Sequence, residues 1–157
     1  MSNNINIQDA MTFFMDHRNS NAQEKFAEYF FLKDLILTAA LKGHKLNIAR
    51  SDFDAFGYDI IISNEINKIL YIQLKAKSGG STKKWDVHKS LLRNQNGRVV
   101  LIELKIDSTK NLAPKYLMFK KTETDTALSN PGKKENRCKV LRSQFEDITE
   151  DLLKIFK

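Results

Sequence analysis

Two neighbouring segments, GYDIIIS at residues 57–63 and YIQLKAK at residues 71–77, decide how this chain is expected to fold. Both are rich in the β-branched and aromatic residues that favour strands. Residues 64–67 lie between them and have the polar composition of a turn. We therefore predict a strand at 57–63 and a returning strand at 68–77, joined as a hairpin.

The hairpin is expected to bring three polar side chains to one end of the sheet. Side chains alternate between the two faces of a strand, so Gln73 and Lys75 share one face while the apolar residues between them point into a core. Asp59 opens the preceding strand, beside the end of the returning one. A carboxylate, an amide oxygen and a main-chain carbonyl such as that of Leu74 suit a hard divalent ion such as Mg²⁺. A neighbouring lysine can orient a water molecule and balance charge on a phosphodiester that is being attacked.

The other predicted elements lie on both sides of this hairpin. The pattern of apolar residues predicts strands at 44–49, 99–105 and 115–121, and helices at 7–17, 22–42, 82–94 and 143–156. Residues 122–139 are polar and are expected to form a long loop. Capping-box spacing is present at Ser20 with Gln23 and at Ser143 with Glu146, and Gly43 suits a helix C-terminus. This order predicts an α/β sandwich around a mixed sheet.

Length, charge and cysteine content narrow the class of protein. A chain of 157 residues fits one domain, here with a core at about 22–120 and a loop and helix at about 122–157. No apolar stretch is long enough to cross a membrane, and the first residues do not resemble a secretory signal. The single cysteine, Cys138, excludes an internal disulfide, so we expect a cytoplasmic protein. The net charge of +7 favours a polyanionic partner such as nucleic acid.

The long helix offers a fourth site residue. Glu28 lies on the same helical stripe as Leu32, Leu35 and Ala39, where an unpaired carboxylate is costly to bury. Its partner would be a metal ion or a basic side chain. Glu24 lies one turn earlier on nearly the same face, but Glu28 has the more apolar neighbours.

These residues resemble the PD-(D/E)xK superfamily of restriction-endonuclease-like nucleases over about residues 22–119. The nearest form is the variant with glutamine before the lysine, as in Mrr-type restriction nucleases and Holliday-junction-resolvase-like proteins. The resemblance implies an αβββαβ core and Mg²⁺- or Mn²⁺-dependent cleavage of DNA in restriction, defence or repair. It also implies that Asp59, Gln73 and the carbonyl of Leu74 bind the metal, Glu28 steadies it and Lys75 acts in catalysis. It further implies that two copies pair as a homodimer.

The sequence departs from the family pattern at two positions. Tyr58 replaces the usual proline before the aspartate, and Gln73 replaces the usual acidic residue before the lysine. An inactive member that only binds nucleic acid or a protein therefore stays open as a second hypothesis, and a structural subunit as a third. Asp59 has the simpler alternative role of capping a strand or turn.

Several further residues are candidates for contact with nucleic acid. The predicted helix at 82–94 carries basic side chains that either contact phosphates or are simply solvated, and the loop with Lys133, Lys134 and Arg137 has the same two interpretations. Trp85 and His88 are expected to pack in the core rather than touch a substrate. Asp52 and Asp54 are expected to shape the loop before Asp59, with Asp54 as an alternative metal ligand, and Gly57 to serve backbone geometry. The basic residues predicted to bind nucleic acid are Lys77, Lys83, Lys84, Lys89 and Arg93.

Overall fold

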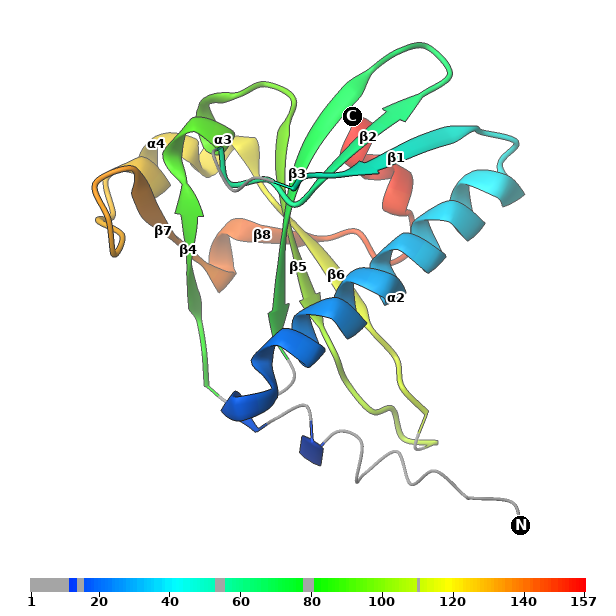
Figure 1. The fold of residues 1–157 in the computed structure, drawn as a ribbon, viewed down its shortest axis with the longest axis horizontal. Helices are drawn as coiled ribbons and strands as arrows, with labels where there is room; N and C mark the ends of the chain where they lie inside the picture. The colour runs from blue at the N-terminus through cyan, green and yellow to red at the C-terminus, as the bar shows by residue number, and fades with distance from the viewer. Residues whose placement is uncertain (1–11, 14–15, 53–55, 78–80, 110) are drawn as a thin grey trace.

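The computed structural model describes residues 12–13, 16–52, 56–77, 81–109 and 111–157. Its centre is a six-stranded sheet in the order β1-β2-β3-β5-β6-β8 (Figure 1). Only β3 and β5 pair in parallel, and all other neighbours are antiparallel. The predicted mixed sheet of an α/β protein is therefore confirmed. The strands are β1 (Leu46–Arg50), β2 (Ile60–Asn64), β3 (Ile69–Lys77), β5 (Gly97–Glu103), β6 (Lys115–Phe119) and β8 (Phe145–Asp147).

Helix α2 (Ser20–Leu41) is the long helix that the sequence predicts. Gly43 terminates the helix two residues after Leu41, with a φ of +73° that is accessible to glycine. The His44 N–H donates to Ala39 O at 2.8 Å. The predicted capping box at Ser20 is wrong, because the N-cap is Asn19 and Ser20 is already helical. The helix expected at 7–17 lies mostly outside the described residues, which include a 3₁₀ turn, η1 (His17–Asn19).

Two apolar clusters cover the two faces of the sheet. One joins α2 to the sheet through Phe31, Leu35 and Ile62, and it also includes the C-terminal 3₁₀ helix η4 (Leu152–Phe156). The other packs β5 and β6 against α3 (Lys89–Arg93), α4 (Thr124–Leu128) and a second, two-stranded sheet. All seven residues of β5 are buried, as predicted for a central strand.

The second sheet replaces the helix predicted at 82–94. Lys84–His88 form β4, which pairs antiparallel with β7 (Arg137–Leu141), and only the following Lys89–Arg93 are helical. Residues 84–88 alternate between polar and apolar side chains, with Trp85 and Val87 apolar, which is the period of a strand. The loop predicted at 122–139 is also wrong in part, since it contains the end of η2 (Lys121–Glu123), α4 and the start of β7.

The C-terminal segment completes the central sheet instead of forming the predicted helix. After the 3₁₀ turn η3 (Arg142–Gln144), β8 pairs with β6, so the expected capping box of Ser143 and Glu146 does not form. The buried Arg98 fixes this segment, because its guanidinium donates to Ile155 O at 2.8 Å and to Lys157 O at 3.2 Å. Burial lowers the pKa of Arg98 from its ordinary value. Within the described ranges, no helix has the length and apolar character needed to cross a membrane.

Candidate functional site

Asp59 lies immediately before the first residue of β2 and extends the hydrogen-bond ladder of that strand by one residue. Its N–H donates to Ile72 O at 2.8 Å, and its carbonyl accepts from Ser51 N at 2.9 Å. The carboxylate then turns toward β3, where Oδ2 accepts from the Leu74 N–H at 2.6 Å. In an extended strand the N–H and C=O of one residue point to the same side. The carbonyl of Leu74 is therefore directed to the side on which Asp59 lies.

Gln73 is the most unusual polar residue of the sheet. Its side chain is 4% exposed, and Oε1 has no hydrogen-bond partner among the described residues. Buried acceptors are rarely left unpaired, and an unpaired one costs about 1–3 kcal/mol. An unsatisfied oxygen at this position therefore fits a site that is completed by a ligand, a cation or water.

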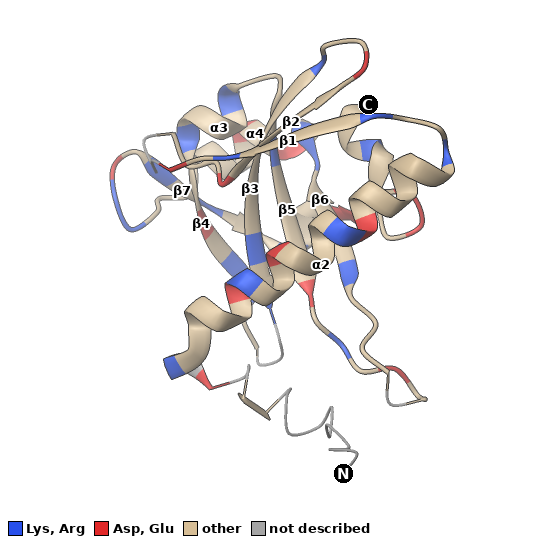
Figure 2. Ribbon diagram, turned by 45° about the vertical axis from the view of Figure 1, so that its right-hand side comes forward, with Lys and Arg blue, Asp and Glu red and all other residues tan. Residues whose placement is uncertain are grey.

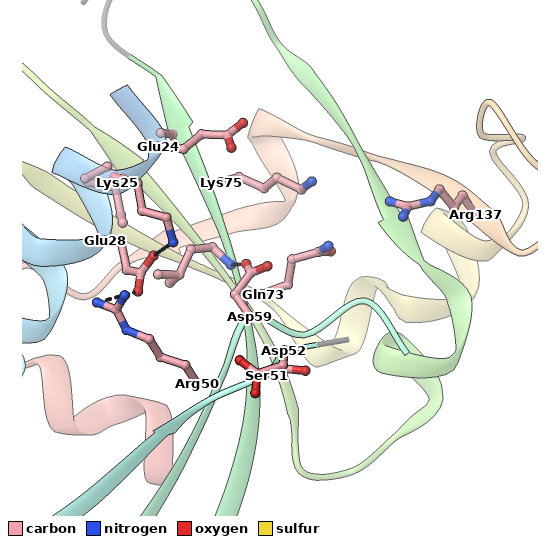
Figure 3. A pocket seen from close by; sticks show the side chains of 14 residues that line it. Glu24, Lys25, Glu28, Arg50, Ser51, Asp52, Asp59, Gln73, Lys75 and Arg137 are labelled. Atoms are coloured by element: carbon pink, nitrogen blue, oxygen red, sulfur yellow. Dashed lines mark hydrogen bonds and ion pairs between the residues drawn. The ribbon is translucent and has the colours of Figure 1, made fainter. Parts of the chain in front are cut away.

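One cavity of about 430 Å³ collects the residues that the sequence places at the active centre (Figure 3). It lies between α2, the ends of β1 and β2, and the middle of β3, with Arg137 of β7 on the far side. Four acidic and four basic side chains line it, so charge is concentrated but balanced. The predicted residues at this cavity are Glu28, Asp59, Gln73, Leu74 and Lys75.

Glu28 is held by two basic side chains. It is 8% exposed, with Oε2 3.2 Å from Lys25 Nζ and Oε1 3.1 Å from Arg50 Nη2. This is the alternative in which the buried glutamate pairs with nearby cations, and its role in steadying a metal stays a prediction. Sequence reasoning missed both partners, although Lys25 lies three residues from Glu28, the spacing of neighbours on one helical face.

The oxygen donors of the cavity fit a hard divalent cation. Asp59 offers a carboxylate, Leu74 a carbonyl on the same side, and Gln73 a buried oxygen that has no partner in the described part of the chain. Within the described part of the chain, no three His, Cys, Asp or Glu side chains gather as a metal cluster. Such an ion would thus depend on amide and main-chain oxygens, and on water, as much as on carboxylates.

The remaining candidates, on α2 and in the segment before β2, have different positions. Glu24 and Asp52 are exposed and line the cavity, while Asp54 lies outside the described residues. Gly57 is buried with φ +78°, and a Cβ at this position would lie 2.4 Å from His88 Cβ. Glycine is thus required where the chain crosses β4 to deliver Asp59.

His88 and Trp85 have structural contacts. His88 is half-buried at the end of β4 rather than inside the predicted helix at 82–94, and its Nδ1 accepts from Ser90 N at 3.3 Å, capping α3. The half-buried ring of Trp85 packs edge-on against Phe145 at 6.1 Å between centroids, consistent with the predicted core role.

The basic residues predicted to bind nucleic acid do not share one surface. Lys83 and Lys84 line a second cavity together with Lys133, whereas Lys89 and Arg93 belong to α3. Lys77 ends β3 and is half-buried. Arg137 lines the first cavity, and neither cavity includes Lys134.

No protein-family model, no curated protein and no solved structure matches this chain.

Proposed function

We propose that this chain is a divalent-cation-dependent nuclease that hydrolyses phosphodiester bonds of DNA. In this proposal the segment from α2 to β6 is a restriction-endonuclease-like core. What supports it is the order of one helix, three antiparallel strands and a crossover to a parallel strand. The observation that carries it is the buried Gln73 Oε1, which has no hydrogen-bond partner among the described residues and lies in the cavity that Asp59 and Lys75 also line.

The expected chemistry divides between the chain and the cation. Bound Mg²⁺ or Mn²⁺ would lower the pKa of a coordinated water and offset charge on the phosphate. Asp59, Gln73 and the Leu74 carbonyl would hold that ion. Lys75 would orient the attacking water and balance charge on the non-bridging oxygens. The water oxygen forms a bond to phosphorus, the bond to the leaving ester oxygen breaks, and a proton reaches that oxygen through solvent.

The second hypothesis is a nuclease-like module that binds nucleic acid without cleaving it. It is favoured by the pairing of Glu28 with Lys25 and Arg50 and by the hydrogen bond of Asp59 to Leu74, which give both carboxylates a role without a metal. Metal-dependent turnover separates the two hypotheses. One site cuts one strand, so cleavage of both strands of a duplex would need the predicted homodimer or two encounters.

The decisive experiment is cleavage of plasmid and linear DNA, with an RNA control, in Mg²⁺, Mn²⁺ or EDTA. We expect metal-dependent nicking that falls at least about 100-fold in Asp59→Ala and Lys75→Ala, since each removes a group that acts on the transition state. The exposed Asp125→Ala and Lys45→Ala variants are charge-matched controls and should keep full activity. A folded wild-type protein that cleaves neither DNA nor RNA would contradict the nuclease and leave the binding module.

A further inference from the structure

A second cavity adjoins the candidate site and shares one residue with it. Lys75 lines both cavities, so they meet at this side chain. The second cavity is an open groove of about 730 Å³ between β3 and the outer part of the β4–β7 sheet. Basic segments lie on β3, β4 and the chain before β7 in Figure 2.

The charges of this groove have almost one sign. Five lysines and one aspartate line it. They come from four parts of the sequence: β3, β4 with the residue before it, the loop before β7, and β7 itself. The groove therefore arises from the fold rather than from a single basic run. Its lysines are Lys75, Lys83, Lys84, Lys133 and Lys139.

Four of these lysines have no acidic partner in the part of the chain that the structure describes. Lys83, Lys84, Lys133 and Lys139 form no ion pair there, in contrast to Lys25, which pairs with Glu28. Like charges on the walls of a cleft repel one another and focus a positive potential. A polyanion in the groove would relieve that repulsion.

The single acid of the groove holds one of its walls in place. Asp86 Oδ2 accepts from the main-chain N–H of Lys133 at 3.1 Å, which ties the loop before β7 to β4. Its other oxygen, Oδ1, is buried without a hydrogen-bond partner among the described residues. Asp86 therefore positions the loop while cancelling little of the charge of five lysines.

We propose that the groove beside β4 and β7 binds the phosphodiester backbone of a nucleic acid strand as it leaves the candidate site. This inference rests on the proposed function for the position of the cleaved bond, but the groove itself can be tested without cleavage. Phosphates contacted by Lys83, Lys84, Lys133 and Lys139 would place the next bond of the same strand against Lys75. Lys89 and Arg93, which the sequence also suggested, lie outside the groove.

The test measures binding of a fluorescein-labelled oligonucleotide by anisotropy in EDTA, so that no turnover occurs. The groove variant is Lys83→Ala/Lys84→Ala, whose side chains are exposed, and the matched control is Lys45→Ala/Lys157→Ala, two exposed lysines that line neither cavity. Losing two phosphate contacts should weaken binding of a single strand about 10- to 30-fold near ~0.1 M salt and reduce the salt slope by about 1.4. The control should bind nearly as tightly as the wild type.

Single-stranded and duplex forms of the oligonucleotide are both measured, because each carries the same phosphodiester chemistry. A loss confined to one form identifies the substrate class, and a loss in both supports recognition of the backbone alone. Equal affinities of the groove and control variants, or no binding by the wild type, would overturn the groove. If the groove variant binds weakly while the wild type lacks all cleavage activity, the groove stands and the nuclease fails.

Discussion

The carboxylate of Asp59 accepts a hydrogen bond from the main-chain N–H of Leu74 at 2.6 Å. Among the described residues, the main-chain pairing on the β2 side of β3 extends only to Ile72, and the Asp59 side chain accepts from the next N–H on that side. The same carboxylate therefore has two roles: it stabilises the split between β2 and β3, and it presents oxygen to the cavity. Both roles depend on Asp59. The first requires an acceptor oxygen on its side chain, and the second requires a carboxylate.

Two substitutions of Asp59 separate these roles. Asp59→Asn keeps an oxygen that can accept from Leu74 N–H, so the free energy of unfolding should stay close to that of the wild type. Asp59→Ala removes the acceptor and should lower it by about 1–2 kcal/mol. Both variants should lose Mg²⁺ binding, because neither has a carboxylate at this position. Urea denaturation and calorimetric titration with Mg²⁺ measure the two effects, and Mg²⁺ binding by Asp59→Asn equal to that of the wild type would contradict the metal assignment.

We expect Gln73 to lower the free energy of unfolding, because its role in the site requires a polar group to be buried. Gln73→Leu removes Oε1, which has no partner among the residues that the structure describes, so its free energy of unfolding should equal or exceed that of the wild type by up to about 1–2 kcal/mol, while cleavage is lost. A clear loss of stability would show that the amide has a structural partner.

Gln73→Glu should have the opposite effect on stability when no metal is present. In EDTA it buries a carboxylate near Asp59 and should lower the melting temperature. Added Mg²⁺ should raise that temperature more than it does for the wild type, because a charged oxygen binds the ion more tightly than an amide. Thermal unfolding with and without Mg²⁺ measures this difference, and Ca²⁺ serves as a second oxygen-seeking cation. A Mg²⁺ response no larger than that of the wild type would argue against a metal at this residue.

The sequence correctly predicts the part of the fold that is built from residues close together in the chain. β2 and β3 are joined by a short turn, and alternation along them correctly places Gln73 and Lys75 on the face opposite to Ile72, which belongs to the first apolar cluster. The same rule brings Asp59 to the end of the sheet. Helix α2 and Gly43 follow from local periodicity and from the conformational freedom of glycine.

The errors come from pairings between distant segments. β4 is a strand because Val87 lies opposite Cys138, about fifty positions later, and both are buried in the second cluster. β8 forms because Phe145 pairs with Phe119 at the edge of the sheet. Local helix signals near Ser143 are too weak to resist that pairing. The pairing of β7 with β4 also forms the groove of lysines. These lysines come from distant stretches of the sequence, so no single stretch predicts the groove.

Gly57 is expected to be needed for the position of Asp59. Gly57→Ala adds a methyl group 2.4 Å from His88 Cβ at a φ of +78°, so we expect a loss of about 2–4 kcal/mol in the free energy of unfolding, from backbone strain plus the clash. Gly43→Ala is the matched control, because its φ is +73° but nothing lies within 4 Å. That variant should lose only about 1 kcal/mol. Equal losses of the free energy of unfolding in the two variants, measured by urea denaturation, would show that His88 moves aside and that its close contact does not require glycine at position 57.

Glu103 should make the stability of the fold sensitive to acid. Burial raises the pKa of this carboxyl, but Arg142, with its Nε 2.5 Å from Oε1, and Lys105 outweigh that effect, so the pKa lies below its ordinary value near 4.5. A lowered pKa in the folded state means that ionised Glu103 stabilises the fold above that ordinary value. The contribution is lost as the pH falls through the folded-state pKa.

Urea denaturation from about pH 7 to about pH 3 tests this dependence. The free energy of unfolding should fall as the pH drops below about 4.5, and the fall should be smaller in Glu103→Gln, which has no carboxylate at this position to take up a proton. Glu103→Gln should also be less stable near neutral pH, because Arg142 then lacks its charged partner. The exposed Glu150→Gln controls for the change in net charge. An acid dependence in Glu103→Gln as steep as that of the wild type would assign the effect to other carboxylates.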